Sequence, residues 1–182
     1  MTDVLLIRHA QSAPSDDVPE PDWPLSEAGS LQAEALASDL EGRQVNAIYA
    51  SPYRRAGATV EPLAQRRGLA IEVAEDLRER KLAHGKLEGW LDHLQHSWAN
   101  RDYKLPGGES ATECQHRVVA SLGAIAAQHQ DASIVVCSHG NALSLFLNSI
   151  EPAFGFEDWR AMTNPALYYL EYRKGTWLWH DR

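Results

Sequence analysis

Short apolar runs alternate along the chain with segments in which apolar residues recur every three or four positions. The runs are typical of strands buried on both faces of a sheet, and the recurring pattern is typical of helices. The predicted strands cover residues 4–7, 45–50, 70–74 and 133–137. The predicted helices cover residues 26–40, 54–67, 87–99, 111–129 and 141–149. Ser26 is suited to cap the first of these helices, because its hydroxyl can accept a backbone N–H.

Strands and helices that follow one another in turn, with short connections, predict a mainly parallel sheet with helices on both faces. Two segments depart from the alternation. Residues 166–172 and 176–179 flank a Lys-Gly pair and predict an antiparallel hairpin, whereas proline and acidic residues in 13–24 predict a long surface loop. No internal repeat is evident, so we expect residues 1–182 to form one three-layer α/β/α domain.

Composition limits the kind of protein further. The chain has 17 basic and 25 acidic side chains and a formal net charge of −8, which argues against binding to nucleic acid or to an anionic membrane. No apolar run approaches the roughly 20 residues that span a bilayer. The first residues lack the basic region of a secretory signal, and the two cysteines do not form a CxxC pair. We therefore expect a cytoplasmic protein without disulfide bonds.

Ionisable side chains follow three of the predicted strands at the point where each strand ends. Arg8 and His9 follow the first strand. Arg55 lies just beyond the second strand, and His139 follows the fourth. Ligands of parallel α/β sheets bind outside the carboxyl ends of the strands, so we expect these side chains to meet at one edge.

The types of side chain at this edge indicate phosphoryl transfer. Two arginines and two imidazoles would neutralise a phosphate dianion, and a histidine with one bare ring nitrogen is a competent nucleophile. Gly140, at the start of the next predicted helix, would add backbone N–H groups and the positive end of a helix dipole. The pattern therefore predicts a locally basic pocket that binds a small phosphorylated substrate.

These strand ends belong to a longer series of short motifs. The motifs are LIRHAQS (6–12), PLSEAG (24–29) with Gln32 and Ala33, SPYRRA (51–56), LRE (77–79), PGGES (106–110) and SHGN (138–141). Their combination and order resemble the histidine phosphatase superfamily, in its phosphoglycerate-mutase-like branch, over nearly the whole chain. The resemblance implies a central mostly parallel sheet flanked by helices. It also implies a metal-free reaction through a phosphohistidine, without a cofactor.

The resemblance further implies a role for each matching residue. His9 would be the nucleophile that attacks phosphorus. Arg8, Arg55 and His139 would hold the non-bridging oxygens and stabilise the charge of the transition state. Glu79 would donate a proton to the leaving oxygen and then act as the base for the incoming water.

Some positions leave alternatives open. The family usually has glycine where this chain has Ala10, which affects the loop geometry more than the reaction. Ser12 would be within reach of the phosphate, and a turn-stabilising role suits it equally well. The residues alone do not select Glu79 from 25 acidic side chains, and a solvated charge in a basic loop is the alternative. Arg54 would point about 100° away from Arg55 on a helix and is left outside the site.

Two further features have weaker support. His93 and His96 lie three apart on a predicted helix, a spacing that metal ligands use, but no third ligand is evident and we expect surface histidines. Trp90 and Trp98 are candidates for the walls of a pocket. We therefore expect no metal site.

The expected function is a metal-independent phosphomonoesterase that acts on a small phosphorylated metabolite. Cofactor-dependent mutases of the family carry extra segments that close the site, whereas a more open site admits water and favours hydrolysis. A mutase is the first alternative, followed by a metal-dependent hydrolase and by a non-catalytic module that binds phosphorylated ligands. Residues 13–24 and 81–104 are expected to choose the substrate, and the oligomeric state is left open.

Overall fold

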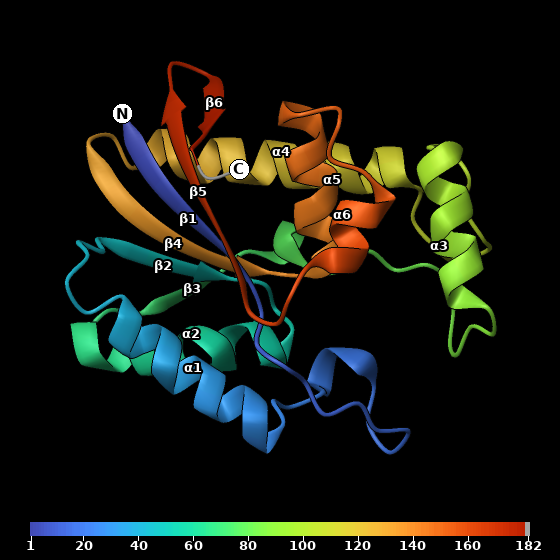
Figure 1. Cartoon of the computed structure of the whole chain (residues 1–182), viewed down its shortest axis with the longest axis horizontal. Coiled ribbons are helices and arrows are strands. Elements are labelled where there is room, and N and C mark those ends of the chain that lie inside the picture. Colours follow the sequence, from blue (N-terminus) through green and yellow to red (C-terminus); the bar gives the residue numbers. More distant parts are fainter. Residues whose placement is uncertain (181–182) are drawn as a thin grey trace.

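A central sheet of six strands runs through the computed structural model, which describes residues 1–180 (Figure 1). The strands are β1 (Thr2–Arg8), β2 (Ala47–Ala50), β3 (Ile71–Val73), β4 (Ala132–Ser138), β5 (Ala166–Arg173) and β6 (Thr176–Trp179). They lie in the order β3-β2-β4-β1-β5-β6; β1 to β4 are parallel, β5 pairs antiparallel with β1, and β6 pairs antiparallel with β5. The predicted mostly parallel sheet and the C-terminal hairpin are thus confirmed.

Helices cover both faces of this sheet. They are α1 (Glu27–Asp39), α2 (Arg54–Arg67), α3 (Trp90–Ala99), α4 (Ala111–Gln128), α5 (Gly140–Ile150) and α6 (Phe156–Ala161), with the 3-10 helices η1 (Glu20–Asp22) and η2 (Glu75–Leu77). Figure 1 shows α1 and α2 on one face and α4 and α5 on the other. Alternate residues of β1 point to opposite faces of the sheet. Leu5 and Ile7 pack in the apolar cluster under α1 and α2, and Val4 and Leu6 pack in the cluster under α4 and α5. No helix among residues 1–180 has the length and apolar character that crossing a membrane requires.

The predicted elements differ from the observed ones mainly at their ends. The helix predicted from residue 87 begins at Trp90, directly after Gly89, which takes a left-handed conformation with φ of 61°. The six-residue helix α6 was not predicted, because it buries only Trp159 and so shows no helical period of apolar positions. The loop predicted at 13–24 contains η1 and is closed at its base, where the Ala13 N–H donates to the Pro24 carbonyl at 2.8 Å.

Helix α1 approaches the segment after His9 closely. Its cap, Ser26, accepts the Gly29 N–H at 3.0 Å and donates its own backbone N–H to the Gln11 carbonyl at 2.9 Å. A Cβ on Gly29 would collide with that same carbonyl oxygen. Only glycine therefore allows α1 to hold the segment beyond β1 at this distance.

The register of the parallel strands brings their carboxyl ends level. Arg8, the last residue of β1, lies opposite Ser138, the last residue of β4. Ala50, the last residue of β2, lies opposite Cys137. The residues that follow these three strands therefore emerge at one edge of the sheet.

Candidate active site

The edge at which β1, β2 and β4 end brings together the predicted side chains. The ring centroids of His9 and His139 lie 5.1 Å apart. The Arg55 Nε donates to His9 Nε2 at 3.0 Å from the first turn of α2. Arg8 lies against Gly140, where a Cβ would come within 3.3 Å of its Nε. Residues from three separate segments thus form one cluster.

His9 has its hydrogen on Nδ1. This nitrogen lies 2.7 Å from the Ala10 carbonyl oxygen, which can only accept, so Nδ1 must donate. Nε2 is then left with a lone pair, which accepts the Arg55 Nε–H. Burial, together with the positive charge of Arg55, lowers the pKa of His9 to about 3. The ring is therefore neutral at physiological pH and has its nucleophilic nitrogen on the side of the arginine.

His139 is fully buried beside this nucleophile. Its Nε2 lies 2.6 Å from the Ser51 hydroxyl, and its Nδ1 has no hydrogen-bond partner among residues 1–180. Burial, and then the charge of Arg55, lower the pKa of His139 well below its usual range. In the absence of a bound anion, both rings are therefore neutral, and the positive charge of the cluster comes from the arginines.

The Arg8 guanidinium is fixed from the other side of the cluster. Its Nη1 donates to the Met162 carbonyl at 2.7 Å, while its buried Nε has no partner within the described residues. Gly140 leaves room for this guanidinium and for the Trp159 indole, whose Nε1 would come within 3.2 Å of a Cβ there. A buried, unpaired N–H of this kind is costly, and a phosphate oxygen would satisfy it.

Glu79 lies at the N-terminus of α5 and is partly buried. Its Oε1 accepts the backbone N–H groups of Arg80 at 2.8 Å and Ala142 at 3.1 Å, and its Oε2 accepts that of Asn141 at 3.1 Å. Burial raises the pKa of Glu79 although these hydrogen bonds act in the opposite direction. The alternative of a solvated surface charge is therefore wrong. The α5 amides expected to bind phosphate are those of Gly140 and its neighbours, yet two of them hold this carboxyl instead.

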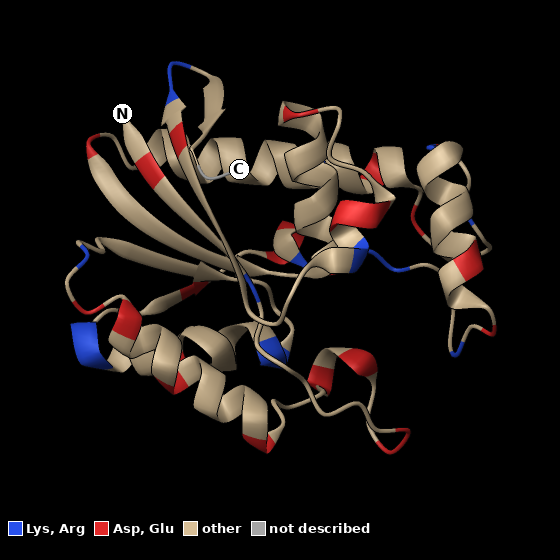
Figure 2. Cartoon of the chain, in the orientation of Figure 1, with Lys and Arg blue, Asp and Glu red and all other residues tan. Residues whose placement is uncertain are grey.

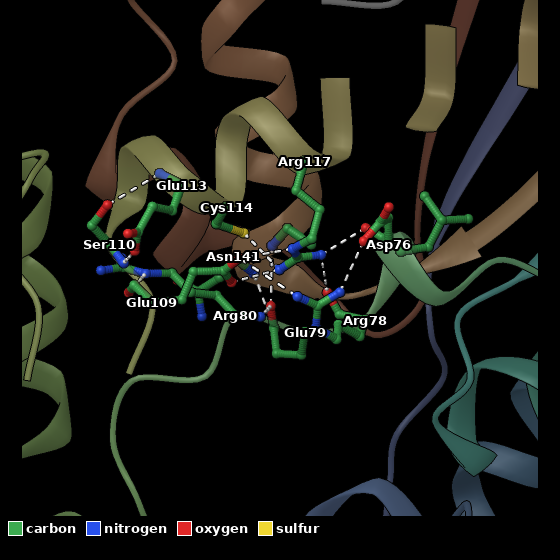
Figure 3. Close-up of polar contacts among 12 residues, drawn as sticks. Asp76, Arg78, Glu79, Arg80, Glu109, Ser110, Glu113, Cys114, Arg117 and Asn141 are labelled. Carbon is green, nitrogen blue, oxygen red and sulfur yellow. Dashed lines mark hydrogen bonds and ion pairs between the residues drawn. The ribbon is translucent and has the colours of Figure 1, made fainter. Parts of the chain in front are cut away.

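The backbone around Glu79 is anchored by a network of arginines (Figure 3). The Arg80 side chain is buried, and its Nε donates to the Glu109 carbonyl at 3.0 Å. Arg117 forms a two-pronged ion pair with the Glu109 carboxylate, at 2.8 and 2.6 Å, and also donates to the Arg78 carbonyl at 3.0 Å. Both neighbours of Glu79 are thus tied to the segment around the start of α4.

Several predicted features lie outside the cluster. Ser12 pairs with Leu25 in an isolated β-bridge, which supports its turn-stabilising role. Arg54 is exposed, as its place on the helix predicts. Trp98 packs against the core, whereas Trp90 lies edge-on to Trp159 with ring centroids 6.2 Å apart.

The histidine pair that has metal-ligand spacing makes other contacts. His93 Nδ1 lies 2.8 Å from the Tyr103 hydroxyl, and the His96 ring contacts the same tyrosine ring edge-on. Within the described part of the chain, no three His, Cys, Asp or Glu side chains form a group that could hold a metal ion.

Three further residues of the site have no role predicted from the sequence, although Ser51 and Tyr53 lie within the SPYRRA motif. Ser51 directly follows β2, so the rule that located the other side chains could have found it. Tyr53 lies edge-on to His139, with ring centroids 4.9 Å apart. Glu20 binds Arg55 from the loop at 13–24, and no sequence signal marks it among the acidic residues there.

The fold and the cluster define a class of protein, an α/β protein with two histidines and two arginines gathered where the parallel strands end. Comparison with known families makes the assignment specific, because residues 4–181 match the histidine phosphatase superfamily (branch 1). The chain therefore belongs to this superfamily and is an enzyme of the phosphatase or mutase type.

The chain is similar to proteins described as either type. Phosphoserine phosphatase 1 of Hydrogenobacter thermophilus is 30% identical over 154 residues, covering 76% of this chain and 71% of that protein. The probable phosphoglycerate mutase GpmB of Salmonella typhi is 27% identical over 197 residues, covering 98% and 88%. A crystal structure of phosphoserine phosphatase from Entamoeba histolytica in complex with phosphoserine has a TM-score of 0.79 and 19% identity, covering 100% of this chain and 96% of that one, and so shows the shared fold.

Proposed function

We propose that this protein is a metal-independent phosphomonoesterase that hydrolyses a small phosphorylated metabolite through a phosphohistidine on His9. The observation that carries the proposal is the state of His9. Its Nδ1 is held by the Ala10 carbonyl, its Nε2 bears a lone pair that accepts the Arg55 Nε–H, and its lowered pKa keeps the ring neutral. A buried neutral imidazole beside two arginines suits nucleophilic attack on a phosphate ester.

In the first step, His9 Nε2 forms a bond to phosphorus while the bond from phosphorus to the ester oxygen breaks. The protonated Glu79 carboxyl gives its proton to that oxygen, a role that its raised pKa favours. Arg8 and Arg55 bind the non-bridging oxygens, and His139 adds a neutral contact. Arg55 must first release His9 Nε2, since its Nε–H occupies that lone pair.

In the second step, water attacks the phosphorus of the phosphohistidine, and the bond between His9 Nε2 and phosphorus breaks. The Glu79 carboxylate accepts the proton from water, which returns both residues to their starting states. The arginines supply the positive charge in both steps, so the proposed reaction needs no metal ion and no cofactor.

The relatives support two candidate reactions. The phosphoserine phosphatase among them supports hydrolysis, whereas the GpmB proteins make the mutase the second candidate. The Glu20 carboxylate lies 2.9 Å from the Arg55 guanidinium, so a negative charge already stands beside the proposed phosphate site. A substrate with a carboxylate close to its phosphate, as both phosphoserine and phosphoglycerates have, would be repelled there, so this charge does not separate the two reactions.

The test is phosphate release from a panel of alkyl, sugar and aryl phosphates, with EDTA present and with His9→Ala measured in parallel. His116→Ala, at an exposed histidine, is the matched control. We expect release that survives EDTA, persists in the control and is lost in His9→Ala. Release that EDTA abolishes would show a metal-dependent hydrolase. Interconversion of phosphoglycerates without release would show a mutase, and phosphate binding without turnover a binding module.

A further inference from the structure

Each of the three nitrogens of the Arg55 guanidinium donates a hydrogen bond within the protein. Its Nε donates to His9 Nε2, its Nη1 donates to the Glu20 carbonyl at 2.9 Å, and its Nη2 donates to the Glu20 carboxylate, also at 2.9 Å. The Arg55 side chain is 4% exposed and that of Glu20 is 48% exposed. The Glu20 carboxylate therefore occupies Nη2 and the Glu20 carbonyl occupies Nη1, the two outer nitrogens that a phosphate group would use.

The backbone of the loop around Glu20 is held in place by prolines and hydrogen bonds. Glu20 begins η1, and Pro19 and Pro21 on either side of it restrict the backbone. The Trp23 backbone N–H donates to the Glu20 carbonyl at 3.2 Å, and the Trp23 indole donates to the Ser15 carbonyl at 2.9 Å. Figure 2 shows the acidic residues of η1 next to the basic start of α2. The loop thus holds Glu20 close to Arg55 without burying it.

We propose that Glu20 is an internal competitor for phosphate and sets the affinity of the site for the phosphoryl group. A phosphate that binds Arg55 through two oxygens, on Nη1 and Nη2, competes with the Glu20 carboxylate for Nη2 and with the Glu20 carbonyl for Nη1. The apparent affinity is then lower than the intrinsic affinity by the fraction of molecules in which Arg55 is released.

The same exchange acts in reverse on the product. Inorganic phosphate leaves a site in which Glu20 returns to Arg55, so the arginine does not remain unpaired after release. A buried guanidinium without a partner would otherwise hold phosphate strongly. Glu20 therefore weakens inhibition by the product as well as binding of the substrate, and product release limits the rate of many enzymes.

The inference rests on the proposed function only in taking Arg55 as a phosphate ligand, so it is tested by binding without turnover. Inorganic phosphate is titrated calorimetrically into wild type, Glu20→Gln and Glu20→Ala at one pH and one ionic strength. Asp22→Asn is the matched control. Asp22 lies on the same η1 helix and is exposed, and its side chain makes no hydrogen bond or ion pair with residues 1–180.

We expect Glu20→Gln to bind phosphate about 5- to 10-fold more tightly, because a neutral amide competes less well than a carboxylate for a guanidinium. Glu20→Ala should gain at least as much, and Asp22→Asn less than twofold. In the activity assay the same variants should show a lower KM and a lower inhibition constant for phosphate.

Unchanged or weaker phosphate binding in both Glu20 variants would overturn the inference, because Glu20 would then orient Arg55 for its ligand. An equal gain in Asp22→Asn would also overturn it, in favour of a general effect of negative charge. So would the absence of measurable binding in both Glu20 variants. Failure of the proposed function can be told apart from failure of this inference. It would appear as absent turnover in the substrate panel, whereas the titrations would still compare phosphate affinity between wild type and the Glu20 variants.

Discussion

Two glutamates reach the cluster of histidines and arginines, and the protein holds them in different ways. Glu79 is bound by three backbone N–H groups, two of them at the start of α5, and both of its neighbours are anchored. Glu20 is bound through its carboxylate by one guanidinium, from a loop, with about half of its side chain exposed. The first arrangement fixes a carboxyl in place, whereas the second can exchange with another anion.

The difference follows from what each contact costs to break. Backbone donors of a helix N-terminus do not move, so Glu79 can lose or gain a proton and stay in position. The Glu20 carboxylate is about half exposed, so water can solvate it when another anion takes its place on the buried Arg55 guanidinium. The comparison therefore assigns proton transfer to Glu79 and control of phosphate affinity to Glu20.

The largest expected effect comes from Glu79→Gln, which keeps the shape of the side chain but cannot donate the proton. Turnover of an alkyl phosphate should fall by about 10²- to 10⁴-fold, and turnover of p-nitrophenyl phosphate much less, since its leaving group needs no proton. Glu20→Gln should leave the ratio of the two rates unchanged. Equal losses on both substrates in Glu79→Gln would remove the proton-donor role.

A smaller effect is expected from Arg117→Met, which releases the backbone beside Glu79 (Figure 3). Misplacing the acid should lower kcat for the alkyl phosphate on the order of 10-fold, with KM little changed and with partial recovery in Arg117→Lys. The matched control is Arg66→Met, which breaks an exposed ion pair with Glu34 at 2.7 Å.

The experiment on Arg117 must distinguish a misplaced Glu79 carboxyl from a general loss of stability. Thermal unfolding shows how far each variant loses stability, and the ratio of alkyl to aryl rates shows whether the acid is misplaced. If Arg117→Met lowers both rates equally, Arg117 acts on stability alone and the network does not position Glu79.

The last expected effect is on stability at acid pH rather than on catalysis, and it contrasts a buried histidine with an exposed one. The pKa of His9 is about 3 in the folded protein against 6.5 for an ordinary histidine, so the unfolded chain binds more protons between these values. The stabilisation is full above pH 6.5 and is lost as pH falls toward 3, by at most about 1.4 kcal/mol per pH unit from this group.

Denaturant unfolding between pH 6.5 and pH 4 measures this slope. His9→Gln should flatten the dependence of the free energy of unfolding on pH by up to one proton, and His116→Gln, at an exposed position, should not. A slope that His9→Gln leaves unchanged would mean that the folded protein does not suppress protonation of His9.

Much of the fold could be predicted because strong local patterns encode it. The apolar runs located β1, β2 and β4, and the rule for parallel sheets placed the residues after them at one edge. Helix α6 was not predicted, because six residues with one buried side chain show no helical period of apolar positions. The start of α3 depends on the left-handed conformation of Gly89, and the spacing of apolar residues gives no information on that conformation.

The site was less predictable wherever it depends on contacts between distant segments. His9 and Arg55 could be placed from their own strands, but the bond between Arg55 and Glu20 joins a helix to a loop without periodicity. The neutral state of His139 likewise results from burial and from neighbouring arginines, which no motif records. Glu79 was identified through resemblance alone, and only the fold shows why its carboxyl stays in place.

The phosphohistidine is the central claim, and it can be trapped directly. A rapidly quenched reaction with a phosphomonoester, kept alkaline and digested, would be analysed by mass spectrometry for a phosphorylated peptide that contains His9. We expect an acid-labile phosphoryl group on His9, formed as fast as turnover and absent in His9→Ala. Full turnover without phosphorylated His9, or with the phosphoryl group on another residue, would contradict the account.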